Sequence, residues 1–96
     1  MVKVGLYVRL EAAQGREDDL ANLLQQGREL VEQEPGTTVW YALRFGPSSF
    51  GIFDAFEDED GRQAHLNGAV AQALGANADL FAEEPKIEQV EVLAVK

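Results

Sequence analysis

The first ten residues alternate between apolar and polar side chains, and this alternation constrains the fold more than any other feature. One side of the segment carries Val2, Val4, Leu6, Val8 and Leu10, and the other carries Lys3, Gly5, Tyr7 and Arg9. A period of two residues is that of a β-strand with one buried face. The chain must therefore build a sheet and cover one of its faces.

A helix is predicted after this strand. Gln14-Gly15 interrupts the alternation, and three acids follow at positions 17–19, where negative charge complements the positive end of a helix dipole. Apolar residues then recur at helical spacing, at Leu20, Leu23, Leu24, Leu30 and Val31. Glu34-Pro35-Gly36 ends the helix, because proline disfavours a helical conformation in the residue before it.

The rest of the chain predicts a hairpin, a second helix and a last strand. Residues 37–45 are rich in β-branched and aromatic side chains, 46–49 read as a turn, and 50–56 supply the partner strand. Asp58 is the expected N-cap of the second helix. That helix carries an apolar stripe and a short extension: Leu66, Val70, Ala73, Leu74, then Leu80 and Phe81. Residues 87–95 form the last strand.

This order predicts an α+β fold of the ferredoxin-like βαββαβ type, in a single domain of residues 1–96. Four antiparallel strands would carry two helices on one face. The other face would not be fully polar, because the strands also offer Tyr41, Leu43, Leu93 and Val95. A sheet that is apolar on both faces but covered on only one can pair with a second sheet, so a homodimer is predicted.

Composition narrows the functions that remain. The chain of 96 residues has a formal charge of −9 and no cysteine. Disulfides and thiolate chemistry are excluded, and an acidic chain repels phosphate backbones, so no nucleic acid partner is expected. The N-terminal residues 1–6 are too short and too alternating for a signal peptide, and no apolar run could span a bilayer. No membrane is therefore expected, and the cytoplasm is the default location.

Few residues could carry chemistry. No cluster has metal-ligand spacing, so no metal site is expected, and there is neither a phosphate loop nor a nucleophile elbow; Ser48 and Ser49 are simply turn residues. The single histidine, His65, lies at the border of the second apolar stripe. It is either a partly buried, hydrogen-bonded side chain or a proton acceptor that contacts a ligand.

Aromatic side chains are the second candidate feature. Most lie on predicted strands, where core packing is the simpler interpretation. Beside arginines and His65 they could instead line a pocket for a flat aromatic ligand. The candidate substrate-binding residues are Tyr7, Arg9, Trp40, Arg44, Phe53 and Phe56. Arg44 has apolar neighbours, so it is either a surface residue on a sheet edge or the partner of an anion or phenolate.

Two segments resemble the antibiotic biosynthesis monooxygenase family. Residues 32–37, Glu-Gln-Glu-Pro-Gly-Thr, followed by an aromatic strand, are similar to the passage from helix to strand in that family. Residues 52–58, followed by Ala64-His65-Leu66-Asn67, are similar to its second signature, a strand, an acidic turn and a helix that bears Ala-His. The resemblance covers essentially the whole chain.

The resemblance implies a dimeric α/β barrel of two ferredoxin-like protomers, with a pocket between helices and sheet in each. Some members oxidise quinols or polycyclic phenols with oxygen and without a metal or organic cofactor. The resemblance therefore implies a cofactor-independent monooxygenase that acts on a small quinol-like or phenolic molecule. His65 matches the histidine of the signature and would accept a proton or orient the substrate.

Departures from the family pattern limit what the resemblance implies. Haem-degrading relatives use an asparagine on the first strand and a tryptophan near the end of the third, where this chain has Tyr7 and Arg9, and Ala55 and Phe56. Haem degradation is therefore disfavoured. Two alternatives stay open: a non-catalytic dimer that binds an apolar metabolite, and an isomerase or tautomerase that uses His65 with a carboxylate such as Asp54.

Overall fold

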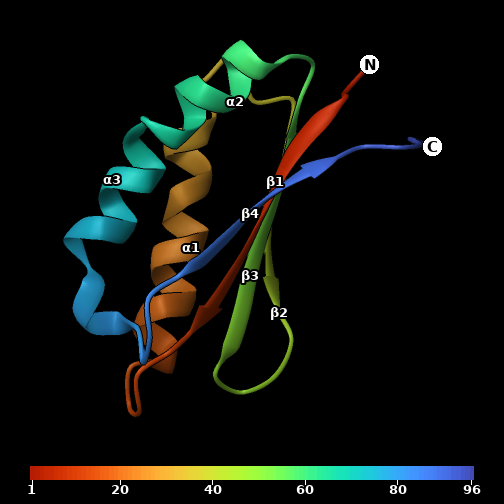
Figure 1. Ribbon diagram of the computed structural model, residues 1–96. Coiled ribbons are helices and arrows are strands. Elements are labelled where there is room, and N and C mark those ends of the chain that lie inside the picture. The colour runs from red at the N-terminus through yellow and green to blue at the C-terminus, as the bar shows by residue number, and fades with distance from the viewer.

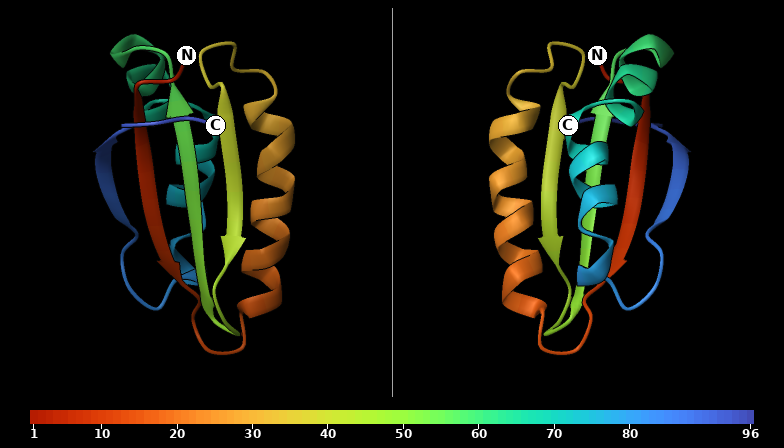
Figure 2. Two further views of the ribbon diagram at one scale, coloured as in Figure 1. Left: turned by 90° about the vertical axis from the view of Figure 1, so that its right-hand side faces the viewer. Right: turned by 90° about the vertical axis from the view of Figure 1, so that its left-hand side faces the viewer.

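The computed structural model describes residues 1–96 as a four-stranded antiparallel sheet with helices on one face (Figure 1). Its elements are β1 (Val4–Glu11), α1 (Glu17–Val31), β2 (Val39–Arg44), β3 (Ser49–Phe56), α2 (Glu59–Leu66), α3 (Ala69–Ala76), the short 3₁₀ turn η1 (Ala78–Leu80) and β4 (Lys86–Glu91). The strand order is β2-β3-β1-β4, with β2 and β4 at the edges (Figure 2). This arrangement confirms the predicted βαββαβ, ferredoxin-like fold.

Strand register decides which side chains share a face. Leu6 of β1 lies opposite Asp54 of β3, which lies opposite Trp40 of β2. Residues paired across antiparallel strands point to the same side, and here that side faces the helices. The neighbouring row, Tyr7, Phe53 and Tyr41, therefore points to the open face of the sheet.

The core lies between the sheet and the helices. Its fully buried members include Leu6 of β1, Leu20 of α1, and Phe50 and Ile52 of β3. The alternation predicted for the first strand is confirmed, since Leu6, Val8 and Leu10 are buried while Arg9 is exposed. The acids at 17–19 occupy the first turn of α1, as expected.

The predicted single second helix is wrong, because it breaks at Asn67-Gly68 into α2 and α3. Both residues have low helix propensity. A Cβ at Gly68 would lie 2.7 Å from Glu34 Oε2, so a larger residue there would displace the Glu34 side chain. Asp58 is the N-cap of α2, as predicted, and accepts a hydrogen bond from the Gly61 backbone at 2.9 Å. No helix has both the length and the apolar character needed to cross a membrane.

The last strand is shorter than predicted. β4 ends at Glu91, and residues 92–96 continue without strand structure. The partner strand β1 begins at Val4, which pairs with Glu91, so no strand residue of β1 lies opposite the residues after Glu91. Beyond this pair, the backbone N–H of Val92 donates to Lys3 O at 2.9 Å. The side chains of Leu93 and Val95 are consequently exposed.

Candidate active site

His65 lies between two carboxylates. Its Nδ1 is 2.5 Å from Glu34 Oε1, and its Nε2 is 3.0 Å from Asp54 Oδ2. The imidazole and Asp54 are buried, with 7% and 1% of their side chains exposed, and Glu34 is partly buried. His65 is thus a buried side chain with partners at both ring nitrogens, in agreement with the first interpretation of its place at the border of the apolar stripe.

Three separate parts of the fold supply these groups. Glu34 comes from the turn after α1, where Pro35-Gly36 redirects the chain towards β2. Asp54 sits on β3, on the face covered by helices. His65 belongs to the last turn of α2, and the ring of Phe56 packs against it at 5.5 Å between centroids. The two carboxylates lie on opposite edges of the ring, so the set cannot converge on one metal ion.

The contacts of His65 limit the protonation states that the imidazole and its two carboxyl partners can adopt. A neutral imidazole has one N–H, so it can donate to only one of the two carboxylates. Either the ring is protonated, or one of the carboxyl groups carries the second proton. Burial lowers the pKa of His65, but the hydrogen bonds and charges of Asp54 and Glu34 outweigh it and raise that pKa. Burial raises the pKa of Asp54, against the opposing effect of His65. Both shifts favour the protonated forms of His65 and Asp54.

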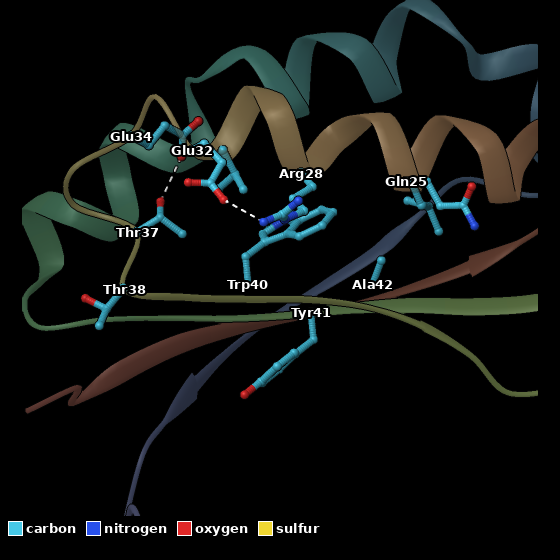
Figure 3. Close-up of a pocket in the computed structure, with 11 residues that line it drawn as sticks. Gln25, Arg28, Glu32, Glu34, Thr37, Thr38, Trp40, Tyr41 and Ala42 are labelled. Carbon is cyan, nitrogen blue, oxygen red and sulfur yellow. Dashed lines mark hydrogen bonds and ion pairs between the residues drawn. The ribbon is translucent and has the colours of Figure 1, made fainter.

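Open space lies on two sides of this set. A small cavity of about 40 Å³ is lined by Asp54, His65 and mostly apolar residues of the sheet and α3. On the other side, a groove of about 580 Å³ runs between α1 and the edge strand β2 (Figure 3). Glu34 and Thr37 line this groove, so the set spans the distance between the cavity and the groove.

Trp40 is the main wall of the groove. Its ring points towards α1, whereas Tyr41 points away to the open face (Figure 3). Trp40 also borders a second, more apolar cavity of about 340 Å³ between α1 and α3. Its indole Nε1 is buried without a hydrogen-bond partner, as are Asp54 Oδ1 and Glu34 Oε2. Unpaired buried polar atoms of this kind are uncommon and are expected where a ligand or water completes the site.

The structure divides the residues predicted to bind substrate between the two faces of the sheet. Trp40 and Phe56 lie on the side of His65, although Phe56 is entirely buried. Tyr7, Arg9 and Phe53 lie on the open face, where the guanidinium of Arg9 stacks over the ring of Phe45 at 4.7 Å. They cannot reach a ligand that contacts His65.

Arg44 is placed at the sheet edge rather than beside His65. Its guanidinium donates to the carbonyl oxygens of Gly46 and Pro47, at 3.3 and 2.9 Å, and lies 4.8 Å from the centroid of the Phe50 ring. Of the two interpretations of this residue, the geometry matches the surface residue that holds a turn.

Sequence reasoning missed Glu34 and Thr37. Both belong to the segment Glu34-Pro35-Gly36-Thr37, which the sequence marks as a helix stop and as part of the family resemblance, without a role for either side chain. Thr37 Oγ1 donates to Glu34 Oε1 at 2.8 Å and lies 3.5 Å from His65 Nδ1. The available signal was a carboxylate and a hydroxyl that flank a tight turn, and it becomes informative only once α2 brings His65 alongside.

Known proteins with solved structures share this fold. The NE2512 protein of unknown function from Nitrosomonas europaea is 58% identical, with a TM-score of 0.97, and the match covers the whole of this chain and 94% of that one. A protein described as a "putative antibiotic biosynthesis monooxygenase", also from Nitrosomonas europaea, is 19% identical over 95% of this chain and 99% of its own, with a TM-score of 0.85. One of the same description from Deinococcus radiodurans is 23% identical over 97% and 95%, with a TM-score of 0.83. No family model and no curated protein sequence matches the chain.

The chain thus has the ferredoxin-like fold of proteins described as "putative antibiotic biosynthesis monooxygenase", as the sequence resemblance predicts. The chain belongs to the same family as the NE2512 protein.

Proposed function

We propose that the protein is a cofactor-independent monooxygenase that oxidises a small quinol or phenolic substrate with dioxygen. The observation that carries this proposal is the buried Glu34–His65–Asp54 set beside a groove walled by Trp40. The relatives described as antibiotic biosynthesis monooxygenases support the reaction class. His65 matches the histidine of the family signature and acts here through its two carboxylates.

The reaction requires a proton acceptor and a site from which part of the water is excluded. Loss of the phenolic proton gives an electron-rich anion that dioxygen can attack at an activated CH₂ carbon. One oxygen atom becomes the new carbonyl and the other leaves as water with the two hydrogens of the CH₂ group, so the substrate supplies all the electrons. A quinol therefore needs such a carbon to be a substrate, because simple conversion to the quinone with release of hydrogen peroxide inserts no oxygen atom. The protein needs only to take the proton and to exclude water from the anion.

The groove combines apolar and polar surface. Leu24, Val31 and Trp40 offer apolar surface, and Glu34 and Thr37 supply polar groups at one end. Gln25 and Arg28 add polar side chains along α1. A volume of about 580 Å³ lies within the range of small-molecule sites.

Oxygen uptake with a panel of quinols and phenols tests the proposal. The wild-type protein should consume oxygen faster than the protein-free control, and His65→Ala should abolish the excess. Arg9→Ala, on the open face, is the matched control and should behave as wild type. Uptake at the protein-free rate with every substrate would refute catalysis, and thermal stabilisation by the same compounds would then favour a binding protein without turnover.

An isomerase or tautomerase is the second candidate, and the 3.0 Å contact between His65 Nε2 and Asp54 Oδ2 favours it. A buried imidazole–carboxylate pair can move a proton between two carbons of a carbonyl compound without oxygen. Incubation of ketone substrates in heavy water would separate the candidates. Deuterium incorporation without oxygen uptake indicates the isomerase, and absence of incorporation argues against it.

We also propose that two copies pair through the open face of the sheet. That face exposes Tyr41, Leu43 and Phe45, with Tyr7 and Phe53 half-buried between them. Contiguous exposed apolar residues of this kind mark interaction surfaces. Light scattering at micromolar concentration should give the mass of two chains, and Tyr41→Asp should reduce it to one. A wild-type mass of one chain would contradict this pairing.

A further inference from the structure

We propose that Thr37 is the residue through which a substrate hydroxyl passes its proton to the buried Glu34–His65–Asp54 set, so that the groove selects molecules with an acidic O–H, a phenol or an enol. The proposal rests on the proposed function of the groove and assigns a role to Thr37, whose side chain would otherwise serve only the turn between α1 and β2.

Thr37 is placed at the junction of the groove and the set. It lines the groove, and its Oγ1 donates to Glu34 Oε1 at 2.8 Å (Figure 3). A hydroxyl has one proton to donate and two lone pairs that accept. Its proton goes to Glu34, and its only other close polar contact is His65 Nδ1, at 3.5 Å. One lone pair therefore remains for a hydroxyl donor bound in the groove.

The other polar atoms of the set are not available to a ligand in the groove. Both ring nitrogens of His65 face carboxylate oxygens. Asp54 is 1% exposed and borders the small cavity on the other side of the set. Glu34 Oε2 is buried beside Gly68, and Glu34 Oε1 already lies against both Thr37 and His65. Thr37 is the remaining hydroxyl that joins the groove to the set directly.

The proton path conserves charge and atoms. At rest, one proton lies in the Glu34–His65 contact and one in the His65–Asp54 contact. The substrate O–H proton moves to Thr37 Oγ1 as the Thr37 hydroxyl proton moves to Glu34 Oε1. The proton of the Glu34–His65 contact then resides wholly on Nδ1. The substrate becomes an anion, and the set gains one proton and loses one negative charge.

Arg9 provides a control outside the groove, because it lies on the open face of the sheet. In the oxygen-uptake assay, Thr37→Val should lower kcat by about 100-fold, the order expected for the loss of a proton-transfer group. Thr37→Ser, which keeps the hydroxyl, should stay within about threefold of wild type, and so should Arg9→Ala. Activity of Thr37→Val equal to that of wild type and of Arg9→Ala would overturn the role of Thr37 and leave the monooxygenase proposal standing.

A chromogenic phenol tests the inference without turnover. Wild-type protein and Arg9→Ala should bind 4-nitrophenol with an increased fraction of the yellow phenolate, because the set takes its proton. Thr37→Val should bind it as the neutral phenol, and Thr37→Ala replaces that variant if circular dichroism shows that it is unfolded. A phenolate signal that needs the Thr37 hydroxyl, in a protein without oxygen uptake, would uphold Thr37 and refute the monooxygenase. No phenolate signal in wild type, or an equal signal in Thr37→Val, would overturn the inference.

Discussion

The two faces of the sheet are built from the same four strands but differ in what they surround. The face under the helices buries three titratable groups in one hydrogen-bonded set, within a core that includes Leu6 and Ile52. The open face has its charged residues near solvent, such as Arg9 over Phe45, and leaves Tyr41 and Leu43 exposed. The two faces therefore suit different roles. The covered face holds groups that can transfer a proton, and the open face holds the exposed apolar residues through which we propose that two copies pair.

The largest expected effect comes from removing the buried ring. His65→Ala leaves Asp54 and Glu34 without the group between them, and loss of one partner of a buried charged set costs about 3–5 kcal/mol of unfolding free energy. Arg9→Ala on the open face removes an exposed cation and should cost less than about 1 kcal/mol. Urea unfolding of the three proteins measures both. Similar costs for the two variants would show that the buried set is not electrostatically distinct.

The next largest difference in unfolding free energy is expected when one leucine on each face of the sheet is replaced by alanine. Leu6 is 1% exposed and Leu43 is 37% exposed. Leu6→Ala should cost about 2–5 kcal/mol of unfolding free energy, because it leaves a cavity in the core. Leu43→Ala should cost clearly less at high dilution. Its cost should grow with protein concentration if the open face pairs, because association stabilises the folded chain by mass action. Equal costs at high dilution would contradict the difference in packing.

A smaller effect is expected from pH. The pKa of His65 is raised in the folded protein above its ordinary 6.5, by Asp54 on β3 and Glu34 in the turn after α1. The stability that His65 contributes is therefore fully present below pH 6.5 and is lost as the pH rises through the raised value, with about 1.4 kcal/mol for each unit of difference. Asp54 acts in the same direction from 3.8 upwards, because its pKa is also raised.

Urea midpoints across this pH range measure the effect, with His65→Gln as the control. The wild-type protein should lose more stability than the variant as the pH rises above 6.5. The variant accounts for the general repulsion of a chain of charge −9, which affects both proteins. Parallel pH profiles would mean that His65 has no raised pKa.

The sequence by itself determined the order of the elements and the covered face of the sheet. Alternation in β1, the acids at 17–19 and the N-cap Asp58 act within a few residues, so local pattern was enough to place them. It also singled out His65, the only histidine in the chain.

Tertiary structure alone decided what His65 contacts. Glu34 lies 31 positions away in the sequence, and the two meet because the turn after α1 and the last turn of α2 are brought together in the fold. The alternation of β1 already placed Tyr7 and Arg9 opposite its apolar residues, but only tertiary structure decided that the histidine packs on the apolar side and that Phe53 shares the face of Tyr7. Which candidate residues meet on one side of the sheet depends on the register of the strands and on contacts between residues that are far apart in the sequence. Residue types and local patterns do not contain this information.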